Sequence, residues 1–258
     1  MDMIETIKVR VENRVAWIAL DRPPLNILDI AMMRSLDATL RRVIPQCDFL
    51  IFQGAGPQGF SAGADVADHA PDRVRKMLAA FHAAVRSIAK ADCLTLAVVH
   101  GHCLGGGMEL ATFCDFVIAG ESAQFGQPEI KLGCFPPVAL VTLPRLIGLR
   151  AAMDLILTGR TIPATEAQRL GLVTHVVPNA DLRAAADGLL AELRALSPAV
   201  LRLTRRALWR LHASDFEKQI AAVERLYLTK LINSRDAQEG VRAFLERRAP
   251  LWQRNRTE

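Results

Sequence analysis

Two glutamates, Glu109 and Glu129, stand in otherwise apolar surroundings that are punctuated by glycine and proline. Burial of a carboxyl group in such a place raises its pKa and makes it a competent proton carrier near neutral pH. Two carboxyls that converge on one apolar pocket can divide the acid and base roles, or share a bound water. The pair therefore indicates acid–base chemistry, although two carboxylates that merely begin helices would show the same spacing.

The stretch His100–Asp115 supplies a second chemical element, because Gly105–Gly107 lies just before Glu109 and the apolar run Leu94–Val99 leads into it. This pattern predicts a strand, a tight glycine turn and a helix start. Glycines let a ligand approach the backbone and leave N–H groups free to point at it, and the first helical turn favours negative charge. We expect an anion-binding turn here, with a simple packing turn as the alternative.

Two further glycine patterns point to other classes of enzyme. Gly54–Gly59 fits GxGxxG, but Pro57 interrupts it and no helix is expected at its third glycine, so dinucleotide binding is not favoured. Gly59–Gly63 fits GxSxG and leaves a serine hydrolase acting through Ser61 as an alternative. A nucleophile elbow, however, requires a strand directly before the serine and a helix directly after it.

Composition limits the class of protein. The chain has 258 residues, of which 51% are hydrophobic, enough for one large domain with a full core. Its five cysteines form no CxxC pair, and His100, His102 and Cys103 lack a partner cluster, so neither a disulfide framework nor a metal site is expected. The sequence shows neither a membrane-length apolar run nor a secretory signal, so we expect a cytoplasmic protein.

The net charge of +5 is concentrated in the last quarter of the chain. Residues 194–258 hold 14 lysines and arginines against 7 acidic residues. Such a basic region predicts an anionic partner, which is a phosphate, a nucleic acid or an acidic cofactor. A solvated basic helix face is the alternative interpretation.

Apolar periodicity predicts alternating strands and helices to about residue 180 and only helices from Asp181 onward. We expect a core domain over residues 1–193 and a helical region over 194–258, whose apolar stripes, Tyr227 included, must pack on the core or on a neighbouring subunit. Phe60–Asp65 is predicted to be a loop. The predicted strands are Ile7–Val11, Val15–Leu20, Phe49–Gln53, Leu94–Val99, Phe116–Ala119 and Val173–Val177. The predicted helices before residue 180 are Asp29–Val43, Asp72–Ala91, one ending near Thr112, Val138–Ile147, Ala151–Leu157 and Ala164–Leu170.

Six motifs, in this order and spacing, resemble those of the crotonase family of enoyl-CoA hydratases and isomerases over nearly the whole chain. They are Arg22–Asn26, Phe60–Asp65, His100–Glu109, Cys114–Asp115, Phe125–Ile130 and Phe244–Arg248. The resemblance implies an α/β fold, in which ββα repeats form a spiral and a C-terminal helical region mediates trimerisation. It also implies a homo-trimer or a hexamer that is a dimer of trimers.

The resemblance also implies the layout of the site. The thioester carbonyl of an acyl-CoA would lie between the backbone N–H groups of Ala64 and Gly106, which form an oxyanion hole. Glu109 would help to activate a water, and Glu129 would deliver a proton to the α-carbon. No separate cofactor is expected, because coenzyme A is part of the substrate. The other residues assigned to CoA or substrate binding are Arg22, Leu25, Ala62, Asp65, Val66, Gly105, Cys134, Phe135, Pro136 and Arg248.

Retention of both glutamates favours a hydratase over an isomerase, since family isomerases typically keep an acid only at the Glu129 position. The chain departs from the usual pattern at Cys134-Phe-Pro-Pro137, where many hydratases have a glycine-rich run. The two prolines stiffen the wall beside Glu129 and should reshape the acyl pocket. This variant resembles the branch that hydrates cyclohexa-1,5-diene-1-carbonyl-CoA. A general short-chain enoyl-CoA hydratase, an isomerase, the serine hydrolase and an RNA-binding protein remain as alternatives, of which nucleic-acid binding is not favoured.

Overall fold

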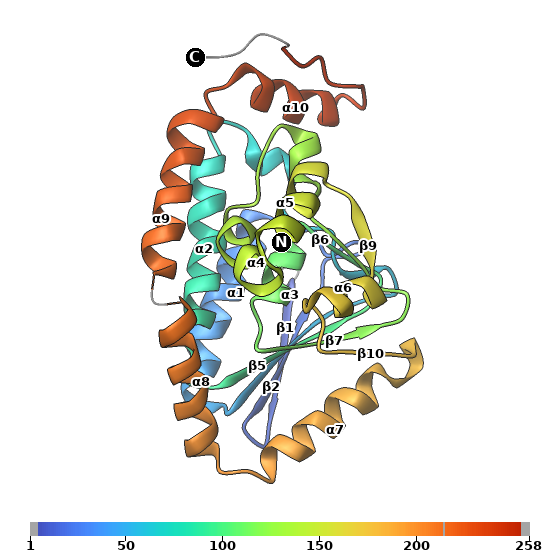
Figure 1. The fold of residues 1–258 in the computed structure, drawn as a ribbon, viewed down its shortest axis with the longest axis vertical. Helices are drawn as coiled ribbons and strands as arrows, with labels where there is room; N and C mark the ends of the chain where they lie inside the picture. The colour runs from blue at the N-terminus through green and yellow to red at the C-terminus, as the bar shows by residue number, and fades with distance from the viewer. Residues whose placement is uncertain (1–4, 214, 254–258) are drawn as a thin grey trace.

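The computed structural model describes residues 5–213 and 215–253, and two β-sheets form their centre (Figure 1). The larger sheet has six strands in the order β1-β2-β3-β5-β7-β10; β1 and β2 form an antiparallel hairpin, and the other pairs are parallel. Its strands are β1 (Ile7–Glu12), β2 (Val15–Leu20), β3 (Phe49–Gly54), β5 (Leu94–Val99), β7 (Phe116–Gly120) and β10 (His175–Val177). All six residues of β5 are buried, as expected for a central parallel strand with both faces covered.

The smaller sheet has four strands of three residues each, in the order β4-β6-β8-β9. Its strands are β4 (Gly59–Ser61), β6 (His102–Leu104), β8 (Gln124–Gly126) and β9 (Thr161–Pro163). The prediction that Phe60–Asp65 is a loop throughout is therefore wrong at its start. Three-residue strands are too short to show the alternation by which strands are recognised, and pairing with neighbours forms them.

The two sheets result from one repeating unit along the chain. Each unit places one strand in the large sheet, the next strand in the small sheet and then a helix: β3-β4-α2, β5-β6-α3 and β7-β8-α4. This arrangement confirms the predicted spiral of ββα repeats. The helices before β10 are α1 (Ile30–Val43), α2 (Val74–Ala89), α3 (Gly106–Thr112), α4 (Pro137–Ile147), α5 (Leu149–Thr158) and α6 (Ala164–Leu170).

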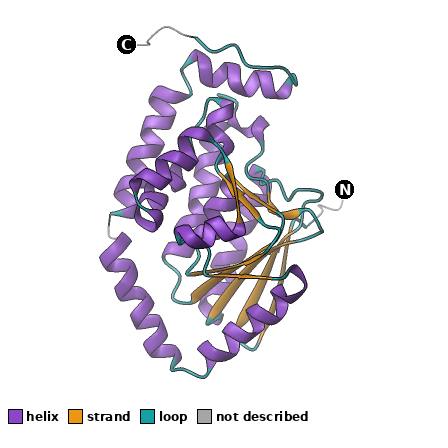
Figure 2. Cartoon of the chain, turned by 45° about the vertical axis from the view of Figure 1, so that its right-hand side comes forward, coloured by secondary structure: helices purple, strands orange, loops and turns teal. Residues whose placement is uncertain are grey.

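Helices cover both faces of the large sheet (Figure 2). On one face, α7 (Leu182–Arg194) buries Ala186 and Leu190 against Ile51 and Leu96 of the sheet. On the other face, the main core joins the sheet to α1, α2 and α3. Asp29 caps the N-terminus of α1, because its side chain accepts a hydrogen bond from the N–H of Met32 at 2.8 Å.

The C-terminal helices dock on the core of the same chain. They are α8 (Pro198–Ala213), α9 (Phe216–Leu226), a π-helical turn (Tyr227–Leu231) and α10 (Arg235–Leu245). Phe216, Ile220 and Tyr227 join the main core, and α9 runs beside α2 (Figure 1). The boundary between residues 193 and 194 remains a prediction. Within the described ranges, no helix is long and apolar enough to span a bilayer.

Candidate active site

The loop after β4 and the start of α3 meet at the centre of the spiral. A Cβ atom on Gly106 would lie 3.6 Å from the backbone nitrogen of Ala64, so the two N–H groups belong to one small region. Gly106 is the first residue of α3, where the N–H has no acceptor within the helix. The N–H of Leu28 donates a hydrogen bond to the carbonyl of Gly63, and the N–H of Asp65 donates one to the carbonyl of Leu28. These two hydrogen bonds fix the loop and do not use the N–H of Ala64. Two backbone donors are thus available side by side.

Glu109 lies in the first turn of α3, and its side chain is 3% exposed. Its Oε1 atom accepts a hydrogen bond of 2.7 Å from the N–H of Ala139 at the start of α4. Burial raises the pKa of Glu109 to about 7, while the N–H groups of Ala139 and Val138 act in the opposite direction. Glu109 is therefore a carboxyl that can gain or lose a proton near neutral pH.

Glu129 lies in the 3-10 turn Pro128–Leu132, next to the glycine turn. A Cβ atom on Gly105 would lie only 2.5 Å from Oε1 of Glu129, so the carboxyl packs against bare backbone. Its Oε2 atom is buried and has no hydrogen-bond partner among the described residues. Burial raises the pKa of Glu129 well above its usual value, and the charge of Glu109 raises it further.

The environments of the two carboxyls differ, and the difference determines which of them holds the proton. Glu109 has backbone donors that stabilise its anion, whereas Glu129 has an unpartnered oxygen and a neighbouring negative charge. When the pair holds one proton, that proton resides on Glu129. A shared proton between two differently stabilised carboxyls is the arrangement by which one acts as base and the other as acid.

Both carboxyls and both backbone donors line one small cavity of about 20 Å³. This volume is enough for one water-sized molecule. The surrounding wall is mostly apolar, with two polar side chains. Its remaining lining residues are His69, Met77, Leu78, Phe81, Phe135, Pro136, Pro137 and Tyr227.

A larger cleft of about 690 Å³ shares Ala64, His69 and Glu129 with the small cavity. It brings together most of the residues assigned to CoA binding from the sequence. These are Arg22, Leu25, Ala62, Asp65, Val66, Gly105 and Arg248. Phe135 and Pro136 line the small cavity instead. Nine of the ten assigned binding residues thus lie on the two connected cavities.

Cys134 is the exception. Its side chain is 1% exposed and lines neither cavity, so the structure does not bring it to the site. Arg248 lines the cleft, but its guanidinium forms ion pairs with Glu239 and Glu246. Part of its charge is therefore already compensated within the protein.

Sequence reasoning missed three polar residues of the site. His69 lines both cavities, Lys131 lines the large cleft, and Tyr227 lines the small one. Lys131 is exposed and has no ion pair with any described residue. Lys131 could have been predicted, because it follows Glu129 by two residues. Tyr227 could not, because its position in the sequence shows only that it belongs to an apolar helix stripe.

The geometry argues against the serine hydrolase. Ser61 is fully buried, its hydroxyl donates to the carbonyl of Asn26 at 2.7 Å, and it accepts from the N–H of Gly63 at 3.1 Å. A hydroxyl engaged in two backbone hydrogen bonds ties loops together and is not presented to a substrate.

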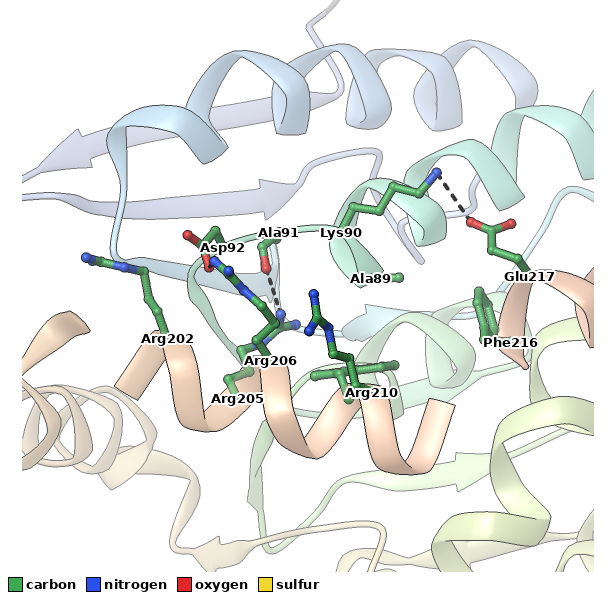
Figure 3. Close-up of a pocket in the computed structure, with 11 residues that line it drawn as sticks. Ala89, Lys90, Ala91, Asp92, Arg202, Arg205, Arg206, Arg210, Phe216 and Glu217 are labelled. Atoms are coloured by element: carbon green, nitrogen blue, oxygen red, sulfur yellow. Dashed lines mark hydrogen bonds and ion pairs between the residues drawn. The ribbon is translucent and has the colours of Figure 1, made fainter. Parts of the chain in front are cut away.

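A second cleft, of about 540 Å³, lies between α8 and the end of α2 (Figure 3). Its arginines come from α8 and account for much of the basic bias of the C-terminal region. Arg202 pairs with Asp48, Arg206 with Asp92, and the buried Arg205 with Asp115. Because three of its four arginines, all but Arg210, are paired among the described residues, the cleft is a poor nucleic-acid site, and these three arginines attach α8 to the core.

Comparisons with known proteins agree with this geometry. The model of the enoyl-CoA hydratase/isomerase family matches residues 10–255. The chain is 36% identical to the cyclohexa-1,5-dienecarbonyl-CoA hydratase of Thauera aromatica, over 91% of each chain. It is 38% identical to a probable enoyl-CoA hydratase of Mycobacterium bovis, over 95% of this chain and 97% of that protein.

Comparison with solved structures also points to enoyl-CoA hydratases. The crystal structure of an enoyl-CoA hydratase from Mycobacterium avium subsp. paratuberculosis matches 96% of this chain and 98% of its own. The TM-score is 0.86 at 27% sequence identity. The fold, the sequence matches and the paired glutamates beside the glycine turn agree, and the chain belongs to the enoyl-CoA hydratase/isomerase family of enzymes, the crotonase family.

Proposed function

We propose that this protein is a hydro-lyase that adds water to a double bond conjugated to a coenzyme A thioester. The observation that carries the proposal is the small cavity, where two buried carboxyls face one water-sized space beside two free backbone donors. An isomerase moves a proton and needs one carboxyl, whereas hydration needs a base for the water and an acid for the α-carbon.

The mechanism follows from the different environments of the carboxyls. Ionised Glu109 accepts a proton from water as the water oxygen attacks the β-carbon. Negative charge moves onto the thioester oxygen, which the N–H groups of Ala64 and Gly106 stabilise. Protonated Glu129 then delivers its proton to the α-carbon, so that H and OH add across the double bond. Proton exchange between the carboxyls restores the starting state.

The large cleft is the proposed site for the coenzyme A portion. Lys131 has no ion pair among the described residues and places positive charge on its wall, suited to a phosphate group, whereas Arg22 and Arg248 are already paired with carboxylates. Leu25, Val66 and Phe244 offer apolar contacts to the remaining, chain-like part of the coenzyme A thioester. Five free, buried thiols suit a reducing compartment, and we propose a cytoplasmic enzyme.

The proposed acyl group is cyclohexa-1,5-diene-1-carbonyl, and a short-chain enoyl group is the second candidate. The Thauera aromatica relative acts on the cyclic diene according to its name. In this chain Phe135, Pro136 and Pro137 form part of the wall of the small cavity, and the two prolines make this part of the wall stiff. A rigid ring loses less conformational freedom than a flexible chain when it binds against such a wall.

Mass spectrometry across a panel of coenzyme A thioesters tests both levels of the proposal. The panel contains crotonyl-CoA, longer enoyl-CoAs, cyclohex-1-ene-carbonyl-CoA and the cyclic 1,5-diene. We expect a fast mass gain of one water, fastest with the cyclic diene. Fastest hydration of crotonyl-CoA would contradict the cyclic diene as substrate and would identify the protein as a general short-chain enoyl-CoA hydratase. A shifted double bond or a lost coenzyme A without water addition would contradict the hydratase.

We also propose that the chain assembles as a homo-trimer or as a dimer of trimers. Val200, Leu203 and Leu211 make an apolar stripe on the outer face of α8 and are 60–76% exposed. A second stripe, with Leu149 and Leu157, lies on α5. Two exposed apolar stripes on different faces of one chain suit a head-to-tail ring, in which each subunit offers both.

Sedimentation velocity checks this assembly with one variant and one control. Leu203→Asp places a charge in the α8 stripe and is expected to shift the protein from trimer or hexamer toward monomer. Val11→Asp, at an exposed position of β1 that belongs to neither stripe, is expected to leave the assembly unchanged. A wild-type protein that sediments as a monomer would contradict the proposal.

A further inference from the structure

The hydroxyl of Tyr227 is a buried polar group that the mechanism above leaves without a role. The residue is 1% exposed, and its oxygen has no oxygen or nitrogen partner among the described residues; its one polar contact is the thiol of Cys134, a weak hydrogen-bonding group. A buried hydroxyl with so weak a partner is costly, and phenylalanine would fill the same volume without that cost. A group kept at such a cost is a candidate for contact with a ligand.

The position of Tyr227 indicates which group its hydroxyl contacts. The residue lines the small cavity together with Glu109 and Glu129. Its ring packs edge-on against Phe135, with ring centres 5.0 Å apart and planes at 74°, which fixes its orientation. Burial raises the pKa of Tyr227, and the Cys134 thiol and the charges of Glu129 and Glu109 raise it further. At neutral pH the hydroxyl is therefore a hydrogen-bond donor within electrostatic reach of both carboxyls.

The local backbone supports a functional role. Tyr227 begins the π-helical turn Tyr227–Leu231, where the N–H of Ile232 bonds to the Tyr227 carbonyl at 3.0 Å. Single π-turns within helices occur frequently at functional sites, because the extra residue redirects a side chain. Here the turn joins α9 to the segment before α10, and the side chain at its start reaches the small cavity.

We propose that the Tyr227 hydroxyl donates a hydrogen bond to the oxygen atom that enters as water and remains as the β-hydroxyl of the product. The inference rests on the proposed hydration. In the addition, one lone pair of this oxygen forms the bond to the β-carbon, and one hydrogen passes to Glu109. The second lone pair accepts the hydrogen bond from Tyr227, and the second hydrogen stays on the product hydroxyl. Tyr227 thus orients the water without exchanging a proton.

Steady-state kinetics of Tyr227→Phe in both directions provides a specific test. In the enoyl-CoA the oxygen is still a separate water, whereas in the hydroxyacyl-CoA it is part of the substrate. We expect kcat for hydration to fall about tenfold at unchanged KM, and KM for the hydroxyacyl-CoA to rise about tenfold at unchanged kcat. Both changes lower kcat/KM equally, so the overall equilibrium constant is preserved.

Two controls separate this role from a structural one. Tyr227→Phe keeps the aromatic packing on Phe135, and its melting temperature is expected to be equal to or higher than that of the wild type. Thr229→Val removes a hydroxyl from the same π-helical turn, where it bonds only to the Arg225 carbonyl, and is expected to leave the kinetics unchanged.

Three outcomes overturn the inference. Unchanged kinetics in both directions would show that the hydroxyl contacts no reacting atom. Equal KM increases for both thioesters at unchanged kcat would assign Tyr227 to packing against the acyl group. A lower melting temperature with normal kinetics would make the Cys134 thiol its partner. A wild-type enzyme that hydrates none of the thioesters would instead remove the proposed function itself.

Discussion

Glu129→Gln is expected to lower the hydration rate by about a thousandfold while changing acyl-CoA binding by no more than about twofold. The amide has nearly the shape of the carboxylic acid, so the wall beside Gly105 is preserved. It has no acidic proton to deliver to the α-carbon. Rapid-mixing or steady-state hydration assays measure the rate, and calorimetry with a non-reactive saturated acyl-CoA measures the binding.

The same substitution should not destabilise the protein. Burial raises the pKa of Glu129, so the folded state holds its proton at pH values where the unfolded chain has released it. A carboxyl of this kind makes stability fall as the pH rises above about 4.5, its ordinary pKa. The melting temperature of Glu129→Gln should therefore exceed that of the wild type at pH 8, and the difference should vanish near pH 4.

The exposed Glu121 offers an isosteric control on the turn after β7. Glu121→Gln is expected to keep wild-type turnover and wild-type stability. The acid role of Glu129 would be wrong if Glu129→Gln retained most of its turnover. It would also be wrong if loss of turnover were accompanied by loss of acyl-CoA binding, because the carboxyl would then act mainly in binding.

Gly105→Ala is the second substitution with a large expected effect, a loss of turnover of at least about a hundredfold. The φ angle of Gly105 is +50°, a conformation that side chains rarely adopt. In addition, the new methyl group would lie 2.5 Å from Oε1 of Glu129, so the carboxyl must move. A displacement of about 1 Å of a reacting group costs on the order of a hundredfold in rate. Steady-state assays of hydration measure this loss.

Gly56→Ala separates the two causes of this loss. Gly56 also has a positive φ angle, +75°, but a methyl group there would meet nothing within 4 Å. Its alanine variant should lose stability from backbone strain alone and keep its turnover per folded enzyme. Equal activity losses in the two variants would mean that strain, and not displacement of Glu129, reduces the rate.

The larger elements and the residues that carry the chemistry are predictable from the order of amino acids. Helices such as α1 and α2 and strands such as β5 have long apolar patterns that are recognisable without any contact to the rest of the chain. Glu109 and Glu129 were identifiable because carboxyls are rare in apolar, glycine- and proline-rich segments. The family motifs then predicted the ββα spiral, which the structure and the comparisons confirm.

The small sheet and the set of polar residues that line the cavity depend on contacts between distant parts of the chain. Each strand of β4, β6, β8 and β9 has three residues and becomes a strand by pairing with segments distant in the chain. Cys134 was assigned to the substrate but lines neither cavity, whereas Tyr227, one more member of an apolar stripe, lines the small cavity. A side chain's direction depends on the turn that presents it and on the elements packed around it, and neither is encoded in the local pattern of residues.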